Sequence, residues 1–107
     1  MVIEIGKEFK HDWYGECNPV IIDGNEVGIL IHEVSDVIEI NQIWIEPEYR
    51  RLGYGKAIVQ YLFDLYPNKD IVGLCEPDKV AYGFWKSLGV EFNREDVDWY
   101  IPFVLHC

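Results

Sequence analysis

The sequence predicts an α/β domain in which a central mixed β-sheet is flanked by helices, and three observations lead to this prediction. Residues 38–66 contain a β-branched strand pattern, a turn with two glycines and a helical pattern, in that order. A short apolar run at residues 71–75 follows the helix and fits a strand parallel to the first one. Two hairpin signals before residue 38 add antiparallel strands, so the sheet is expected to be mixed.

The first third of the chain is expected to contribute short strands. Residues 2–5 predict one strand, whereas residues 6–18 are polar, have no clear period and receive no assignment. Apolar runs then lie on both sides of an Asp23-Gly24 pair, which supplies the positive φ angles of a tight hairpin turn. The strands of this hairpin are expected at residues 20–22 and 27–31.

A second hairpin turn, at Ser35-Asp36, is expected to lead into a strand at residues 38–45. The apolar positions of this strand are 38 and 40, then 43 and 45, so the alternation slips by one residue across Asn41-Gln42. An extra residue in the strand, a β-bulge, would produce this slip. A strand buried on both faces would look similar, because Trp44 makes the apolar run nearly continuous. The sequence leaves both interpretations open.

Two helices are expected in the second half of the chain. The first begins near Gly55 and stops at Pro67-Asn68, and its apolar residues form one face that should pack on the sheet. The second, residues 79–88, is expected to be capped by Asp78 and to end at Gly89. Two closing strands are expected at residues 90–92 and 99–105.

The turn between the central strand and the first helix has the chemistry of an anion-binding site. Gly53 and Gly55 carry no side chain that would keep a ligand away from the backbone. Successive N–H groups at a helix N-terminus attract anions, and three cations surround them: Arg50, Arg51 and Lys56. A phosphate-bearing ligand is the expected occupant, although an ordinary polar turn with two glycines would carry the same pattern.

These residues resemble the acetyl-CoA-binding signature of the GNAT N-acyltransferase superfamily, R/Q-x-x-G-x-G/A after a strand that ends in Pro. Here the signature corresponds to residues 50–55, which follow Glu46-Pro47. A second family segment, A-x-x-x-Y-x-x-x-G-F, is similar to residues 81–90. Two segments in the right order are more specific than either alone. The resemblance implies the GNAT fold, acetyl-CoA as co-substrate and transfer of an acetyl group to a primary amine.

The resemblance also implies which residues meet the cofactor. A backbone N–H near Trp44 or Ile45 would stabilise the oxyanion of the reaction if a bulge opens the strand there. The residues expected at the cofactor are Trp44, Ile45, Arg50, Arg51, Leu52, Gly53, Tyr54, Gly55, Lys56, Asp78 and Trp85.

The implied chemistry needs a general base, because an amine is protonated at neutral pH. Glu39 is the predicted base, since it lies eleven residues before Arg50, where a branch of the family that acetylates lysine side chains carries its base. Ile38 and Ile40 are expected to raise the pKa of Glu39 by desolvation. A solvent-facing strand Glu is the alternative. The competing candidates for the base are Glu33, Glu46 and a water chain.

The implied chemistry also has a place for a general acid. The family often uses a Tyr to protonate the leaving thiolate, at the position that matches Trp85 here, and indole cannot act as that acid. Tyr82 lies one helical turn earlier and is the predicted substitute, with packing as its alternative role. Because the CoA thiolate is already a fair leaving group, loss of this acid need not abolish turnover.

The charge of the chain argues against one class of partner. The formal net charge is −10, and residues 1–49 carry eleven acidic and two basic side chains. Residues 50–86, around the expected phosphate site, carry six basic and four acidic side chains. Such an acidic chain is a poor candidate for binding nucleic acid. Its field instead predicts a cationic amine as the acceptor, on a small molecule or a peptide, such as a polyamine, a lysine side chain or a basic N-terminus. A solvated acidic surface would carry the same charge.

Length and composition predict one domain, residues 1–107, because half of the residues are hydrophobic and the chain suffices for a single core. The sequence has neither an apolar run that would span a bilayer nor a signal-peptide layout at its start, so a cytoplasmic protein without membrane contact is expected. Three cysteines without C-x-x-C spacing indicate neither a disulfide framework nor a zinc site. No metal ligands are predicted.

The resemblance is weakest near the first strands. The family usually places two helices between its first and second strands, where this chain has only about a dozen residues. The Trp13-Tyr14 loop or a second copy in a homodimer could complete the acceptor site. Together with Trp85, this departure leaves two function classes open: a small N-acetyltransferase, or a catalytically weak CoA-binding or protein-interaction module with the same fold.

Overall fold

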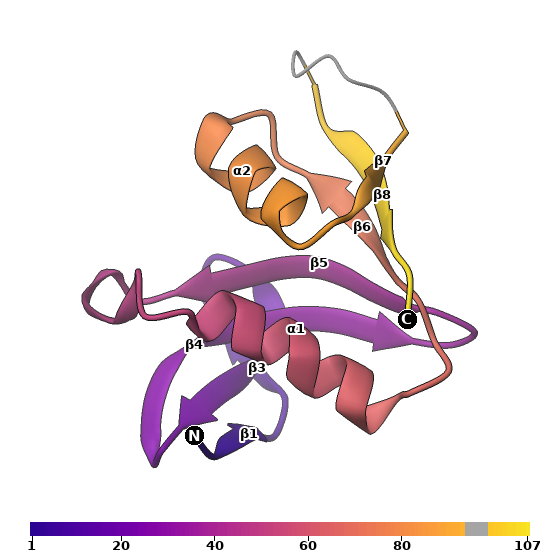
Figure 1. Cartoon of the computed structure of the whole chain (residues 1–107). Coiled ribbons are helices and arrows are strands. Elements are labelled where there is room, and N and C mark those ends of the chain that lie inside the picture. The colour runs from indigo at the N-terminus through magenta and orange to yellow at the C-terminus, as the bar shows by residue number, and fades with distance from the viewer. Residues whose placement is uncertain (94–98) are drawn as a thin grey trace.

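The computed structural model describes residues 1–93 and 99–107. These residues form one mixed sheet with two α-helices and a short 3-10 helix (Figure 1), so the predicted fold class is confirmed. The elements are β1 (Ile3–Ile5), β2 (Phe9–His11), β3 (Gly15–Ile22), β4 (Asn25–Val34), β5 (Ile38–Ile45), η1 (Pro47–Tyr49), α1 (Tyr54–Leu65), β6 (Ile71–Cys75), α2 (Lys79–Ser87), β7 (Glu91–Phe92) and β8 (Ile101–Leu105).

The strands follow the order β1-β3-β4-β5-β6-β8-β7, and β2 pairs with the first residues of β3, Gly15 to Cys17. The parallel pair is β5 and β6, and the other paired strands are antiparallel. Figure 1 shows α1 in front of β4 and β5 and α2 beside β6, and it shows β6 and β8 rising steeply away from β5. The sheet is therefore spread open in its middle.

The hydrophobic core lies between the sheet and the two helices. Ile58, Val59 and Leu62 of α1 are buried against it, and Trp85 is the buried residue of α2. Fully burying an aliphatic side chain contributes about 1.5–3 kcal/mol, so each of these three residues stabilises the attachment of α1 to the sheet. Cys75 is fully buried in β6, as expected of a core residue. In the described part of the chain, neither helix combines the length and apolarity needed to cross a membrane.

The sequence predicted the central elements well. The predicted bounds of β5 and β6 are the observed ones, and the two strands are parallel. The first hairpin turns at Asp23 and Gly24, whose φ angles are 50° and 84°. Asp78 caps α2 by accepting a hydrogen bond from Ala81 N at 2.8 Å. Gly89, with a φ of 85°, follows the end of α2, which stops one residue earlier than expected.

The β-bulge in β5 is confirmed, and it lies at Asn41. In the ladder with β4, the partners of Ile40 and Gln42 are consecutive residues, so Asn41 is left without a partner. One extra residue shifts the alternation of all following side chains. Ile43 and Ile45 therefore return to the helix side, where they pack against the core.

The unassigned segment at residues 6–18 contains β2 and the first part of β3. β3 begins at Gly15, five positions before the predicted strand. Pro19 lies inside β3, where Pro is uncommon, and this residue hid the strand pattern. Its carbonyl oxygen still accepts a hydrogen bond from Gly6 N at 2.9 Å, which joins β3 to the segment after β1.

The chain after β5 and the last strands also differ from the prediction. η1 was not expected; it follows β5 directly, and Pro47 occupies its first position, where a missing N–H costs nothing. β8 begins at Ile101, so the predicted strand at residues 99–105 was two residues too long at its start. Trp99 and Tyr100 look like strand residues, but their side chains are exposed and do not join the core.

Candidate functional site

The site lies where β5 and β6 part. Their parallel ladder ends at Ile40 and Gly73, although both strands continue beyond these residues. A cavity of about 820 Å³ opens on the side of the helices, and a second cavity of about 510 Å³ opens between the strands. We name them the helix-side cavity and the strand-side cavity. Five residues line both: Ile40, Asn41, Gln42, Leu74 and Glu76. The two cavities therefore meet across the sheet.

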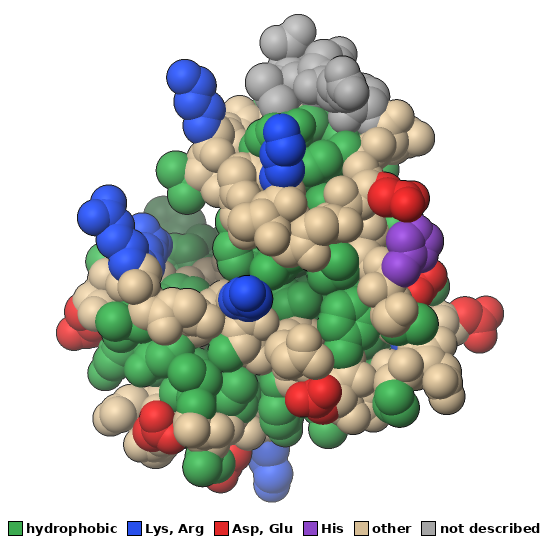
Figure 2. All heavy atoms as spheres, in the orientation of Figure 1, with side chains coloured by type: hydrophobic (Ala, Val, Ile, Leu, Met, Phe, Trp, Pro, Cys, Tyr) green, Lys and Arg blue, Asp and Glu red, His purple; other side chains and the backbone are tan. Residues whose placement is uncertain are grey.

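The two cavities differ in charge. The charged residues that line the helix-side cavity are Arg50, Arg51, Lys56, Glu76 and Asp78. The charged residues that line the strand-side cavity are Glu39 and Glu76. Figure 2 shows most Lys and Arg side chains of this face around the hollow between α1 and α2, with Asp and Glu towards the lower and right-hand edges. The helix-side cavity thus suits an anion, and the strand-side cavity suits a cation.

The N-terminus of α1 can bind an anion, whereas that of α2 is already capped. The N-cap residue of α1 is Gly53, which has no side chain to accept a hydrogen bond from the first turn. Ala57 N donates to Gly53 O at 3.1 Å. The N–H groups of residues 54–56 precede this bond, so they have no acceptor within the helix. At α2 the carboxylate of Asp78 accepts from Ala81 N at 2.8 Å. An anion is therefore expected at α1, where the sequence placed it.

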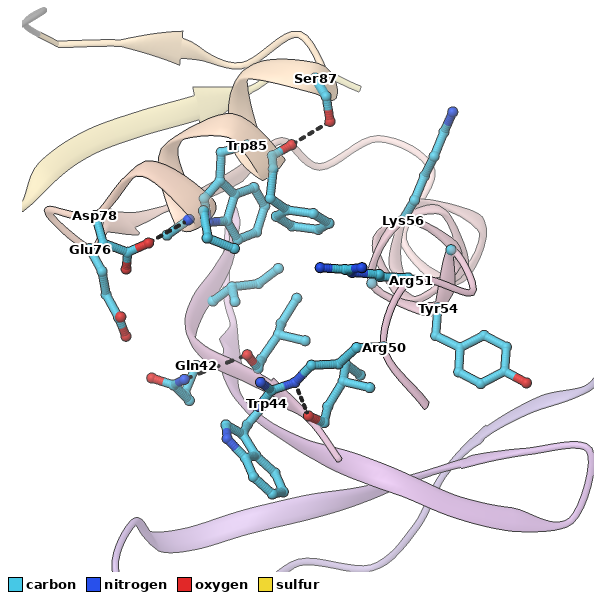
Figure 3. Close-up of a pocket in the computed structure, with 18 of the residues that line it drawn as sticks. Gln42, Trp44, Arg50, Arg51, Tyr54, Lys56, Glu76, Asp78, Trp85 and Ser87 are labelled. Atoms are coloured by element: carbon cyan, nitrogen blue, oxygen red, sulfur yellow. Dashed lines mark hydrogen bonds between the residues drawn. The ribbon is translucent and has the colours of Figure 1, made fainter. Parts of the chain in front are cut away.

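The three cations beside α1 are not equivalent. Arg50 Nε donates to Ile45 O at 2.8 Å, and its guanidinium lies 5.7 Å from the ring centroid of Trp44. In Figure 3 the Arg51 side chain reaches into the cavity towards α2, and Lys56 projects from the first turn of α1. Arg50 is thus committed to the end of β5, whereas Arg51 and Lys56 remain available for a ligand.

Two of the residues expected at the cofactor, Leu52 and Tyr54, offer the helix-side cavity less contact through their side chains than their neighbours do. Leu52 is 56% exposed and lies outside the lining of the helix-side cavity. Tyr54 is part of that lining, but Figure 3 shows its ring pointing away from the cavity. Its ring centroid lies 6.3 Å from that of Tyr49. Neither side chain therefore points into the helix-side cavity.

Arg51 has a φ of 64°, which is a costly backbone conformation for a residue other than Gly. Such strain is often found where function requires a particular side chain. We therefore expect Arg51→Gly to keep or raise the free energy of unfolding, by up to about 1 kcal/mol, while it weakens the binding of a phosphate-bearing ligand. Urea unfolding and ligand titration measure the two effects separately.

The neighbouring residue provides the control for this prediction. Arg50 has a φ of −75°, so Arg50→Gly relieves no strain and should only lower stability. Arg51→Gly would contradict the prediction if it lost as much stability as Arg50→Gly. The guanidinium of Arg51 would then hold the fold together and would not be held ready for a ligand.

The two glycines of the turn have different roles. Gly53 has a φ of 79°, and a Cβ there would meet no atom within 4 Å, so its backbone conformation requires Gly. A Cβ on Gly55 would lie 2.9 Å from the ring of Phe84 in α2. Gly55 thus permits the close contact of the two helices. The sequence assigned both glycines to ligand approach, and the structure adds this packing role at Gly55.

Ile45, and not Trp44, turns its backbone groups towards the opening. Glu46 N donates to Val27 O of β4 at 2.8 Å. Successive residues of a strand point their N–H and C=O groups to alternate sides, so those of Ile45 face away from β4. The bulge lies at Asn41, as the slip in alternation predicted, and not at Trp44 or Ile45, where the oxyanion role was made conditional on a bulge. The parting of β5 from β6 leaves the Ile45 amide accessible.

Glu39 lies in the strand-side cavity and is exposed. Ile38 and Ile40 are buried on the helix side of β5, while Glu39 projects from the opposite face. The expectation that these two residues desolvate Glu39 was therefore wrong. Its partners in the sheet are Glu33 on β4 and Val72 on β6.

Tyr82 does not reach the site. Its ring stacks on Phe92 at a centroid distance of 4.7 Å, and Lys86 Nζ lies 5.6 Å from its centroid. Tyr82 lines neither cavity, so the packing role that the sequence left as an alternative describes it in this structure. Trp85 does line the helix-side cavity; it is 8% exposed, and its ring packs on Phe103 at a centroid distance of 4.3 Å.

Glu76 is the main residue that the sequence analysis missed. It follows β6 directly and lines both cavities. A signal was present, because polar residues just after parallel strands lie at the edge where ligands bind to such sheets. Gln42 also lines both cavities. Its place beside the bulge was recognised, but it received no role.

Comparisons with known sequences agree with this geometry. The sequence model of the acetyltransferase (GNAT) family matches residues 6–90. A protein of Bacillus methanolicus, described as an uncharacterized N-acetyltransferase in the lysA 3' region, is 37% identical over 46 residues. These residues are 43% of this chain and 38% of that protein.

Solved structures show the same fold. The PaiA N-acetyltransferase of Thermoplasma acidophilum, in complex with coenzyme A, aligns with a TM-score of 0.70 and 14% identity over 85% of this chain and 60% of its own. An acetyltransferase of Thermus thermophilus aligns with a TM-score of 0.72 and 10% identity over 86% of this chain and 64% of its own. The chain therefore spans less than two thirds of the length of these relatives.

Proposed function

Because the chain belongs to the GNAT acetyltransferase family, we propose that it transfers an acetyl group from acetyl-CoA to a cationic primary amine. The observation that carries this proposal is the pair of cavities that meet where β5 and β6 part. Two substrates bound on opposite sides of a sheet can react only through such an opening. Holding them there in the right orientation supplies a large part of the rate enhancement.

The helix-side cavity fits acetyl-CoA. The free N–H groups of residues 54–56, with Arg51 and Lys56 beside them, suit a pyrophosphate. Asp78 closes the other helix N-terminus, so the phosphates have one favourable place in this cavity. From there the cavity extends past Trp85 to Leu74, where the strand-side cavity begins.

Acetyl-CoA would supply the activated acetyl group, and residues of this chain would handle the proton and the developing charge. Glu39 first takes a proton from the ammonium group, directly or through one water, which frees the lone pair of the nitrogen. This nitrogen then bonds to the acetyl carbon as the carbon–sulfur bond breaks, and its second proton passes to solvent. The N–H of Ile45 donates to the acetyl oxygen as negative charge grows on it. The thiolate takes its proton from solvent, since the indole of Trp85 is no acid in this range.

The acceptor is proposed to be cationic because of the charges on its side of the sheet. Glu39 and Glu76 line the strand-side cavity, and Glu33 faces Glu39 across the ladder. Cofactor phosphates would neutralise the basic turn, so the acidic first 49 residues would dominate the field at the acceptor entrance. The amine is either a small molecule or a peptide amine.

Thiol release from acetyl-CoA, measured with a panel of amines, tests this proposal beside a calorimetric titration with CoA. We expect release with cationic amines to exceed release with glutamate, and the advantage to shrink as salt screens the field. CoA binding without release for any amine would favour a CoA-binding module with the same fold. Absence of CoA binding would overturn the proposal altogether.

A further inference from the structure

We propose that the acceptor is a primary amine with one charge and an apolar body, and that it binds in the strand-side cavity. This inference rests on the proposed function, and it goes further by naming the chemical class of the acceptor. It follows from two features of the cavity: an apolar strip and the carboxylates along one of its borders.

The apolar strip is made of two cross-strand pairs of β6 and β8. Val72 pairs with Val104, and Leu74 pairs with Pro102; all four residues line the strand-side cavity. Alternate residues of the same strands, such as Phe103, are buried in the core on the helix side. The four side chains therefore project from the opposite face, and Leu74 is 59% exposed. A contiguous exposed apolar strip indicates a binding site, whereas a single exposed Leu is common on protein surfaces.

Two carboxylates border the strip, both on the side of β5. Glu39 is the partner of Val72 in the β5–β6 ladder, and Glu76 follows β6 shortly after Leu74. Among the described residues that line this cavity there is no Lys or Arg. An ammonium group is therefore attracted to this border of the strip, and a carboxylate is repelled from it. A molecule with an amine at one end and an apolar body matches this sequence of surfaces.

A polyamine matches the same surfaces less well. Its second and third ammonium groups would lie farther along the strip, against Val104 and Pro102 of β8, where the described lining of the cavity offers them no carboxylate in exchange for the lost water. The volume of about 510 Å³ is in the usual range for a small molecule. An alkyl or aryl group could fill this space and would displace water from apolar side chains, which is favourable.

A series of n-alkylamines tests the strip in the wild-type protein. With thiol release as the assay, each methylene added from propylamine to hexylamine should raise kcat/KM by up to about fourfold. Hexylamine should exceed both ethanolamine and spermidine by at least about tenfold. A flat series would overturn this inference, and so would a preference for spermidine.

Paired substitutions test whether the strip itself makes the selection. Val72→Thr with Val104→Thr keeps the β-branched shape and adds hydroxyl groups to a cross-strand pair that lines the strand-side cavity alone. The KM for hexylamine should then rise roughly tenfold more than that for ethanolamine. Val34→Thr is the matched control, because Val34 is 37% exposed on β4 and lines neither cavity. Equal changes for the two amines would overturn the assignment of the strip.

A binding measurement separates this inference from the proposed function. In saturation-transfer NMR with the CoA-loaded protein, hexylamine should show transfer, ethanolamine should show little, and the paired Thr variant should lose the hexylamine signal. Transfer to hexylamine without acetylation of any amine would overturn the proposed function and support the cavity assignment. Acetylation of amines without a preference for hexylamine would support the proposed function and overturn the cavity assignment. Neither acetylation nor transfer would overturn both.

Discussion

Replacing Glu39 with Gln should lower kcat by about 10²- to 10⁴-fold and leave the affinity for acetyl-CoA close to that of the wild type. Gln keeps the size of the side chain but cannot accept a proton from the amine. Glu39 lines the strand-side cavity and is absent from the lining of the helix-side cavity, so acceptor chemistry and cofactor binding should separate. Steady-state thiol release at saturating amine gives kcat, and calorimetry gives the affinity for CoA.

Glu33→Gln is the matched control for this experiment. Glu33 lies directly opposite Glu39 on β4 and lines neither cavity, so the substitution makes the same change in charge nearby without removing the proposed base. Equal losses of kcat in the two variants would mean that the negative charge near the bound amine sustains the rate and that Glu39 does not take the proton. An unchanged rate in Glu39→Gln would move the role to Glu76, Glu46 or water.

The elements that the sequence predicted are those whose signals are local. The bounds of β5 and β6 follow from β-branched runs that turn residues interrupt, and the bulge at Asn41 follows from a slip in alternation that neighbouring residues reveal. The cap at Asp78 and the positive φ of Gly89 have similarly local causes. Each needs only a few consecutive residues, so the sequence contains the information.

The parts that the sequence did not predict depend on contacts between distant segments. Tyr82 has the right spacing for a role beside Trp85, but its ring is held by Phe92 of β7, which the helical pattern could not show. The position of Glu76 at the junction of two cavities depends on the parting of β5 and β6. The exposure of Glu39 follows from which face of β5 the helices cover, and alternation alone does not tell the two faces apart.

The turn before α1 departs from the rules of local stability in three respects. Arg51 has a positive φ, α1 has no side-chain cap, and Lys56 stands in its first turn, where the helix dipole favours acidic residues. A sequence selected for stability alone would have Gly, Ser or Glu at such positions. All three departures become favourable when an anion binds, which is why we assign the phosphates to this turn.

Lys56→Glu should therefore reduce CoA binding strongly without destabilising the free protein. At a CoA concentration of 100 times the wild-type dissociation constant, the wild type should gain about 2.7 kcal/mol of stability. If charge reversal raises the dissociation constant about 100-fold, the gain at the same concentration falls to about 0.4 kcal/mol. Without ligand, a Glu in the first turn of α1 should leave the free energy of unfolding unchanged or raise it by about 0.3–1 kcal/mol. Urea unfolding with and without CoA measures both quantities.

Lys7→Glu is the control, because it makes the same change in charge at an exposed position that lines neither cavity. If the acidity of the whole chain opposed CoA, both variants would lose similar amounts of ligand-induced stability, since a long-range field depends little on position. If the first turn of α1 holds the phosphates, the loss should be confined to Lys56→Glu. A full CoA-induced gain in Lys56→Glu would show that the phosphates bind elsewhere, and the assignment of the helix-side cavity to acetyl-CoA would fail with it.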